Sequence, residues 1–162
     1  MSTQPTHDDA NLILRLYELR REEKLRQARD WFAANYRASS FEEAQRIAPM
    51  GSAEHKYTIM VTSYWDMAAS FVASGVLNQE LFFQSGGEML VVWERIRLVV
   101  PELRQAFKSP HMYENLEKVA GQYIQWMESK GPEAYAAFQQ MVHMAPGSAR
   151  PMASAATAKT AS

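Results

Sequence analysis

Asp66 is the residue whose chemical type and position most suggest a functional site. It is the only charged residue in a nearly apolar run that lies between Lys56 and Leu77. An unpaired carboxylate is so costly to take out of water that Asp66 requires a partner, a bound proton or a hydrated niche. A carboxylate held in such surroundings can act as a general base with a raised pKa, or can anchor a ligand.

Two interpretations of Asp66 follow from this position. In the functional one, Asp66 and Arg95 form a small binding site with the aromatic residues Tyr64, Trp65 and Trp93. In the structural one, Asp66 pairs with Arg95 or Arg97, or accepts a hydrogen bond from a Trp, Tyr or Ser side chain, and so holds neighbouring helices in register. We favour the structural role, and the identity of the partner decides between the two.

Other reactive residue types lack the spacing that chemistry requires. His111, Glu114 and Glu117 lie three residues apart, but helical metal sites need Glu-x-x-His pairs on several helices, and this sequence contains none. His55 and His143 stand apart from any Ser and Asp arrangement typical of a triad. Phosphate-binding and dinucleotide-binding fingerprints are also missing. We therefore predict no catalytic residue, no metal and no cofactor.

The segment that carries Asp66 also predicts the architecture. A helix that is apolar on most sides must be surrounded by other elements, so we expect this segment to be the centre of a bundle. No segment shows the strict alternation typical of a half-buried strand. The sequence therefore predicts an all-α, single-domain bundle of five to seven helices.

A long first helix is expected from Asp8 or Asp9 to about Arg37. Its apolar ends flank a charged waist at residues 20–24. A helix of this length would extend about 45 Å. Such a helix could outreach the bundle and contact a partner chain.

The most secure local prediction is a tight corner around Gly75. A glycine can take the left-handed conformation that ends a helix, and Asn78 can cap the next one. Leu77 and Phe82 are spaced for a hydrophobic staple across that cap. Further helix starts or breaks are predicted at Ser39–Ser40, Gly86–Gly87, Pro101, Ser109–Pro110 and Gly131–Pro132.

Composition limits the remaining possibilities. The chain has 162 residues, which we divide into a disordered N-terminus (1–8), a helical domain (9–144) and a disordered tail (145–162). Its 17 basic and 18 acidic side chains give no field that favours nucleic acid. The absence of cysteine and of a signal peptide suits the cytoplasm. The polar residues within the central run argue against a membrane span.

Three segments carry a resemblance to a known family: DDANLILRLYELRREEKLRQARDWF, YWDMAASFVASGVLNQELFF, and VVWERIRLVVPELRQAF with MYENLEKVA. Over about Ala10 to Met127 the sequence resembles a family of small bacterial helical proteins classed as a domain of unknown function. The resemblance implies an all-helical bacterial protein. It brings no activity, ligand or catalytic residue.

These observations predict a non-enzymatic interaction or scaffold protein that binds a protein partner or associates with itself. The expected interface consists of aromatic residues that the bundle could leave exposed: Trp31, Phe32, Trp126 and Phe138. The alternative is a pocket around Asp66 for a small molecule or lipid, or an enzyme site at that position.

Overall fold

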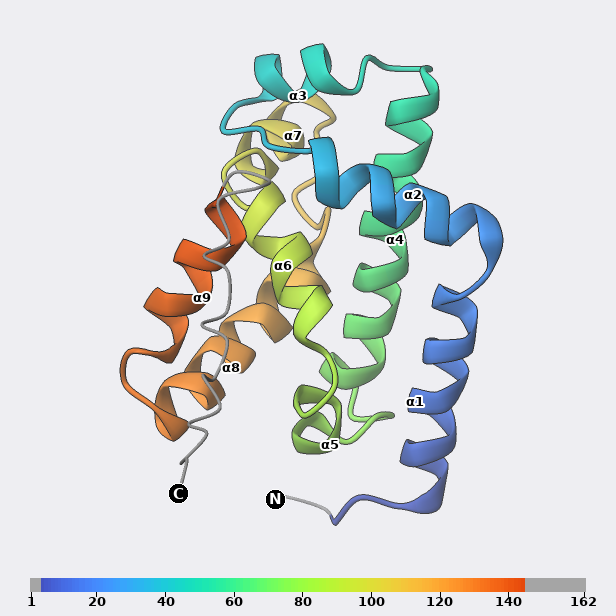
Figure 1. Ribbon diagram of the computed structural model, residues 1–162, viewed down its shortest axis with the longest axis vertical. Helices are drawn as coiled ribbons and strands as arrows, with labels where there is room; N and C mark the ends of the chain where they lie inside the picture. The colour runs from blue at the N-terminus through green and yellow to red at the C-terminus, as the bar shows by residue number, and fades with distance from the viewer. Residues whose placement is uncertain (1–3, 145–162) are drawn as a thin grey trace, which may run out of the picture.

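The computed structural model describes residues 4–144, and within this range the protein folds into nine α-helices with no strand (Figure 1). The all-helical prediction is confirmed. The helix count exceeds the five to seven expected, because several connections carry short helices of their own. In chain order the helices are α1 (His7–Arg20), α2 (Glu23–Asn35), α3 (Phe41–Ile47), α4 (Ala53–Ala73), α5 (Gln79–Phe83), α6 (Gly87–Ile96), α7 (Val100–Ala106), α8 (Glu114–Lys130) and α9 (Ala134–His143).

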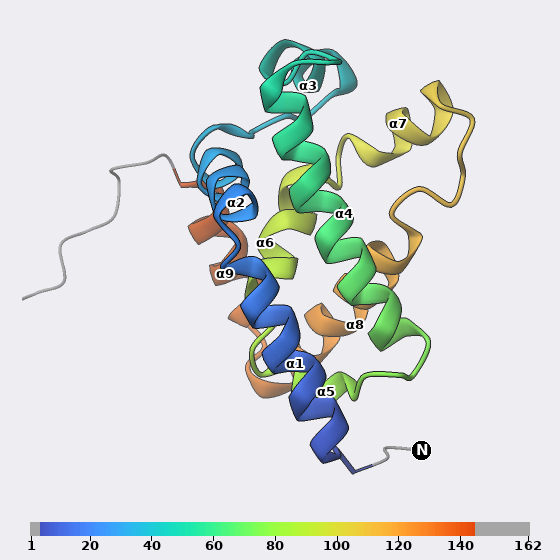
Figure 2. The same cartoon turned by 90° about the vertical axis from the view of Figure 1, so that its right-hand side faces the viewer.

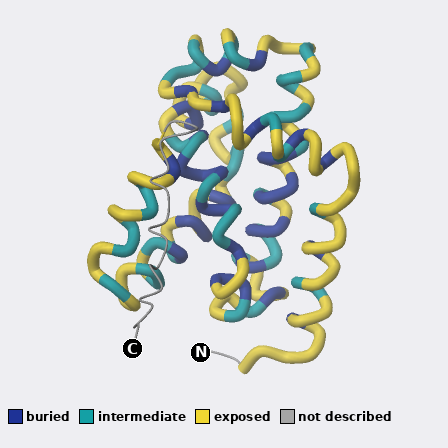
Figure 3. Tube along the Cα trace, viewed as in Figure 1, coloured by how far each residue is buried: buried dark blue, intermediate teal, exposed yellow. Residues whose placement is uncertain are grey.

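Helix α4 is the centre of the bundle, as its apolar sequence predicts. It packs against α2, α6 and α8, and its buried positions continue the blue core shown in Figure 3. Those buried positions are Val61, Thr62, Tyr64, Trp65, Ala68, Ala69 and Val72. Burial of apolar side chains is the dominant favourable term in folding, so α4 contributes strongly to the stability of the bundle.

The prediction of one long first helix is wrong, because the chain turns between α1 and α2. The charged waist is the corner itself. Glu22 caps α2 by accepting a hydrogen bond from the Leu25 amide at 3.0 Å. Arg29 reaches back to the carbonyl of Arg20, at the end of α1, at 3.0 Å. The chain therefore bends, and α2 crosses α4 instead of extending beyond it (Figures 1 and 2).

The start of α1 lies slightly earlier than expected. Thr6 caps the helix and forms a reciprocal pair of hydrogen bonds with Asp9, so the helix begins at His7. The second carboxylate oxygen of Asp9 accepts the Asn78 amide at 2.7 Å. This contact ties the first turn of α1 to the corner that precedes α5. Residues 1–3 of the predicted disordered N-terminus, and the whole predicted tail 145–162, lie outside the described residues.

The corner around Gly75 is confirmed. Gly75 has φ +78°, and the Asn78 side chain accepts a hydrogen bond from the Leu81 amide at 2.9 Å. Leu77 and Phe82 are both buried. Ser40 likewise caps α3.

The predicted helix start at Ser109–Pro110 is wrong. Residues 110–113 form turns, and α8 begins at Glu114. Tyr113, which precedes α8, has φ 58° in the left-handed region. That backbone conformation is costly for a residue with a large side chain, so surrounding contacts must hold it.

Among residues 4–144, no helix combines the length and the apolar character that crossing a bilayer requires.

Candidate functional site

Asp66 caps another helix. Its Oδ1 accepts the backbone amide of Leu116, in the first turn of α8, at 3.0 Å. Tyr113 precedes α8 and supplies no side-chain cap, so α4 provides the acceptor that the helix terminus needs. Burial raises the pKa of Asp66, and the hydrogen bond from Leu116 only partly opposes that shift.

The arginine partners predicted for Asp66 are wrong. Within the described range, neither Arg95 nor Arg97 forms an ion pair with it. Arg95 instead binds carbonyls at the end of α2, with Nη1 3.0 Å from the oxygen of Phe32 and 2.6 Å from that of Ala33. A cation there complements the helix dipole. Burial, with repulsion from Arg37, lowers the pKa of Arg95 to about 10.

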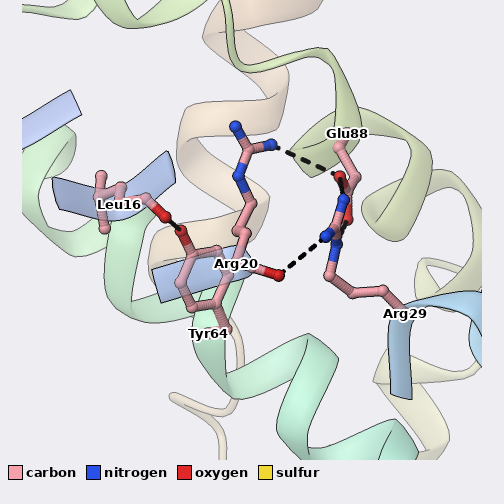
Figure 4. Close-up of polar contacts among 5 residues, drawn as sticks. All are labelled: Leu16, Arg20, Arg29, Tyr64 and Glu88. Carbon is pink, nitrogen blue, oxygen red and sulfur yellow. Dashed lines mark hydrogen bonds and ion pairs between the residues drawn. The ribbon is translucent and has the colours of Figure 1, made fainter. Parts of the chain in front are cut away.

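Tyr64 and Trp65 serve the packing of α1. The Tyr64 hydroxyl donates to the carbonyl of Leu16 at 2.5 Å (Figure 4), and burial raises its pKa to about 12. The guanidinium of Arg20 lies 5.1 Å from the centre of the Trp65 ring. Trp93, the last residue of the predicted site, is buried in the core.

Glu88 completes the corner between α1 and α2. Its carboxylate binds Arg29 through two contacts of 2.6 Å and Arg20 through one of 3.4 Å (Figure 4). The two arginines come from α1 and α2 and the carboxylate from α6, so this ion-pair network fixes three helices. The sequence analysis missed this network, because Glu88 is separated from both arginines by many residues.

The four predicted interface residues differ in how far the bundle covers them. Phe32 is only 2% exposed and stacks on Tyr36. Trp31, Trp126 and Phe138 are half-buried and pack against the core. The exposed large apolar residues of the described range are different ones: Leu14, Tyr17, Leu19, Met50, Ile59, Met67, Val76, Leu98, Phe107, Met141 and Met144.

The described range contains an apolar pocket of about 310 Å³. Its lining includes residues of α3, α7 and the first turns of α4, and these three segments lie toward the same end of the bundle (Figure 2). Its rim includes three of the exposed apolar side chains, Met50, Ile59 and Phe107. Twelve residues line this space, which we call the α3–α4–α7 pocket: Tyr36, Ala44, Gln45, Ala48, Met50, His55, Thr58, Ile59, Leu103, Phe107, Met112 and Tyr113.

The local sequence explains why this space stays open. Helices α3 and α7 have seven residues each. Ala44 of α3 and Ala48, which directly follows that helix, line the pocket with small side chains. The wall formed by Tyr113 is held in place by a 2.9 Å hydrogen bond between its hydroxyl and that of Thr62. This contact also helps to hold the left-handed backbone of Tyr113.

The polar groups of the pocket are mostly engaged. Thr58 donates to the carbonyl of Glu54 at 2.9 Å. His55 Nδ1 accepts the Gly51 amide at 3.4 Å, and Gln45 accepts the Met50 amide at 3.4 Å. No Asp, Glu, Lys or Arg lines the pocket. The lining is therefore mainly apolar, with a few polar groups among the apolar side chains.

A second polar cluster, also missed by the sequence analysis, surrounds Glu94 on α6. Its side chain is fully buried and accepts hydrogen bonds from Tyr135 and, at 3.1 Å, from Arg97. His143 lies 3.5 Å away, so the cluster joins α9 to α6. Burial alone would raise the pKa of Glu94, but the hydrogen bonds from Tyr135 and Arg97 outweigh it and lower that pKa.

The sequence gives only a weak signal for the Glu94 cluster. Glu94 stands in a mainly apolar stretch, but Arg95 and Arg97 lie beside it, so it is not a lone charge as Asp66 is. Across the described residues, no three His, Asp or Glu side chains converge in a way that could hold a metal ion.

The fold and the pocket define a small all-helical protein with an apolar ligand-sized space. Residues 5–126 match the family described as "Domain of unknown function (DUF4760)", and the chain belongs to that family. No curated protein and no solved structure matches the chain. The matched region contains every residue that lines the α3–α4–α7 pocket and ends within α8, before α9.

Proposed function

We propose that this protein is a non-enzymatic binding protein and that the α3–α4–α7 pocket takes up a small apolar molecule. The observation that carries the proposal is the pocket itself, about 310 Å³ in volume and lined mainly by apolar side chains. Ligand sites in proteins start at about this volume and share this apolar lining.

The positions of Asp66 and Arg95 support placing the site here. The alternative in the sequence analysis placed a ligand around Asp66 and Arg95. Both side chains bind backbone groups at helix ends instead. The exposed rim residues Met50, Ile59 and Phe107 are 58%, 46% and 47% exposed. An apolar ligand would cover part of this surface, which favours its binding.

The test is a fluorescence titration with the uncharged dye N-phenyl-1-naphthylamine. Wild-type protein should give a saturable increase in emission. Ala44→Leu, which puts a larger side chain into the pocket, should weaken binding about tenfold or more by occupying the space. Ala137→Leu makes the same change at an exposed position of α9 and should bind like the wild type.

Thermal melting of each variant separates loss of the pocket from loss of the fold. If Ala44→Leu unfolds, Met112→Phe narrows the same pocket from another side. The proposal fails if the wild type shows no saturable binding, or if folded pocket variants bind the dye as tightly as Ala137→Leu.

A second candidate function is association with a protein partner or with a second copy of the chain. Leu14 and Tyr17 favour it, because they lie three residues apart on α1 and are 60% and 51% exposed. Light scattering after size-exclusion chromatography tests self-association. A dimer that Leu14→Gln with Tyr17→Gln converts to a monomer would support it, and a wild-type monomer across the micromolar range would end it.

For the cellular setting we propose the cytoplasm of a bacterium, with no nucleic acid among the partners. The support comes from the cysteine-free sequence, its near-neutral charge balance and the family resemblance. Cell fractionation of the tagged native protein tests the location.

A further inference from the structure

We infer that the ligand of the α3–α4–α7 pocket is an uncharged, mainly apolar molecule with a hydrogen-bond acceptor that the Tyr36 hydroxyl binds. This inference rests on the proposed function and adds the chemical class of the ligand. Ketones, esters and similar oxygenated hydrocarbons belong to this class.

Tyr36 offers a hydrogen-bond donor at the pocket. The residue follows α2 directly, is only 3% exposed and lines the pocket. Its ring is fixed by stacking on Phe32, with 4.8 Å between the ring centres. Among residues 4–144, no side chain or carbonyl forms a hydrogen bond with its hydroxyl, and that oxygen is not one of the fully enclosed polar atoms without a partner, so it is accessible from the pocket. A ligand that covers this hydroxyl has to supply an acceptor in place of water, because a phenol cut off from water normally has a partner.

The second phenol of the pocket makes the contrast clear. The hydroxyl of Tyr113 is already paired with Thr62 at 2.9 Å. Burial, followed by the influence of Tyr113, raises the pKa of Tyr36 to about 12. Tyr36 therefore keeps its proton at neutral pH and can donate it in a hydrogen bond.

The lining offers no Lys or Arg side chain to an ionised ligand. The Nδ1 atom of His55 already accepts the Gly51 amide. A carboxylate or phosphate entering this space would lose water without gaining a counter-charge, which is strongly unfavourable. A neutral oxygen atom loses less on entry and can be compensated by one hydrogen bond.

Three probes of similar size test this inference by displacement of N-phenyl-1-naphthylamine: acetophenone, ethylbenzene and benzoate. Wild-type protein should bind the two neutral probes and should bind benzoate most weakly. Tyr36→Phe should weaken acetophenone about fivefold, the ratio that one ordinary hydrogen bond gives, and should leave ethylbenzene unchanged. Tyr123→Phe removes a buried hydroxyl outside the pocket lining and should change neither.

Infrared spectroscopy gives a second measurement on the same complexes. The carbonyl stretch of bound acetophenone should lie at lower frequency in the wild type than in Tyr36→Phe. The inference alone is overturned if Tyr36→Phe affects acetophenone and ethylbenzene equally, or if benzoate binds as tightly as acetophenone. If neither the dye nor any probe binds the wild type, the proposed function fails together with this inference.

Discussion

The two halves of α4 differ in what surrounds them. From Val61 to Val72 the helix is enclosed by α2, α6 and α8, which have 13, 10 and 17 residues. From His55 to Ile59 it faces the pocket beside α3 and α7, which have seven residues each. Long neighbours close the space around a helix, and short neighbours leave part of it open.

This comparison shows that the residues that stand out in the sequence are not those that line the pocket. The enclosed half carries Asp66 and the aromatic residues that a reader of the sequence notices first. Its polar groups, however, bind helix ends and carbonyls, as the contacts of Asp66 and Tyr64 show. The open half carries ordinary residues such as Thr58 and Ile59, and there the protein offers room for a ligand.

The largest expected effect contrasts Trp65 with Ile59. Trp65→Ala should lower the free energy of unfolding by about 4 kcal/mol, because it leaves a cavity in the enclosed half. Ile59→Ala should cost less than about 1 kcal/mol, since that side chain is 46% exposed. Urea denaturation measures both. Equal losses would show that the two halves are packed alike.

The next effect concerns the ion-pair network behind the enclosed half. Glu88→Ala should lower the free energy of unfolding by about 2 kcal/mol. The substitution leaves the partly buried side chains of Arg20 and Arg29 without their carboxylate partner. Glu18→Ala is the matched control, as its pair with Arg15 is almost fully exposed, and it should cost less than about 0.5 kcal/mol. A Glu88 variant as stable as the Glu18 variant would contradict the role of the network.

Asp66 offers a smaller effect with a distinctive pH dependence. Asp66→Ala should cost about 1 kcal/mol by removing the cap on Leu116. Asp66→Asn keeps an oxygen acceptor and should be at least as stable as the wild type at pH 7. The reason is that burial raises the pKa of Asp66 above its ordinary value, so ionisation of this side chain is less favourable in the folded state than in the unfolded state.

The sign of that dependence is testable by melting between pH 3 and pH 7. Protonated Asp66 contributes stability to the folded protein. That contribution is fully present below the pKa that Asp66 has in the unfolded chain, and it is lost as the pH rises through the higher pKa of the folded state. The free energy of unfolding of the wild type should therefore rise relative to that of Asp66→Asn as the pH falls. The opposite trend, or ligand binding abolished by Asp66→Asn, would return Asp66 to the functional site.

The smallest effect lies at the boundary between the halves. Thr62→Val should cost about 1 kcal/mol or less, because it removes the partner of the Tyr113 hydroxyl. Thr58→Val removes only a hydroxyl bonded to its own helix and should cost less still. Dye affinity should fall in the Thr62 variant, since Tyr113 forms part of the pocket wall. Unchanged affinity would show that the wall does not depend on this bond.

The parts of the fold that were predictable are those that local sequence controls. The apolar run of α4 requires burial, and Gly75 with Asn78 specifies a corner by conformation and capping. The turn at Glu22 was not predictable in this way. It depends on Arg29, which reaches back to Arg20 and across 59 residues to Glu88.

The candidate site was less predictable for a physical reason. A pocket is space that side chains fail to fill, and no spacing of residue types encodes the distance between α3 and α7. Tyr36 gave no signal either, because a tyrosine at the end of a helix is usually part of the core. Only the coordinates show that its hydroxyl lacks a partner among the described residues.

The manner in which α9 is attached has a consequence for local stability. Val142 is the one residue of α9 that is buried. The polar contacts of α9 with α6 are those of Glu94 with Tyr135, Gln139 and His143. Detachment of this segment would expose Val142 and part of Phe138, which is less apolar area than unfolding of α4 exposes, and water would solvate the released carboxylate. Amide hydrogens of α9 should therefore exchange with solvent by sub-global opening, well before those of α4 are released by unfolding of the entire bundle.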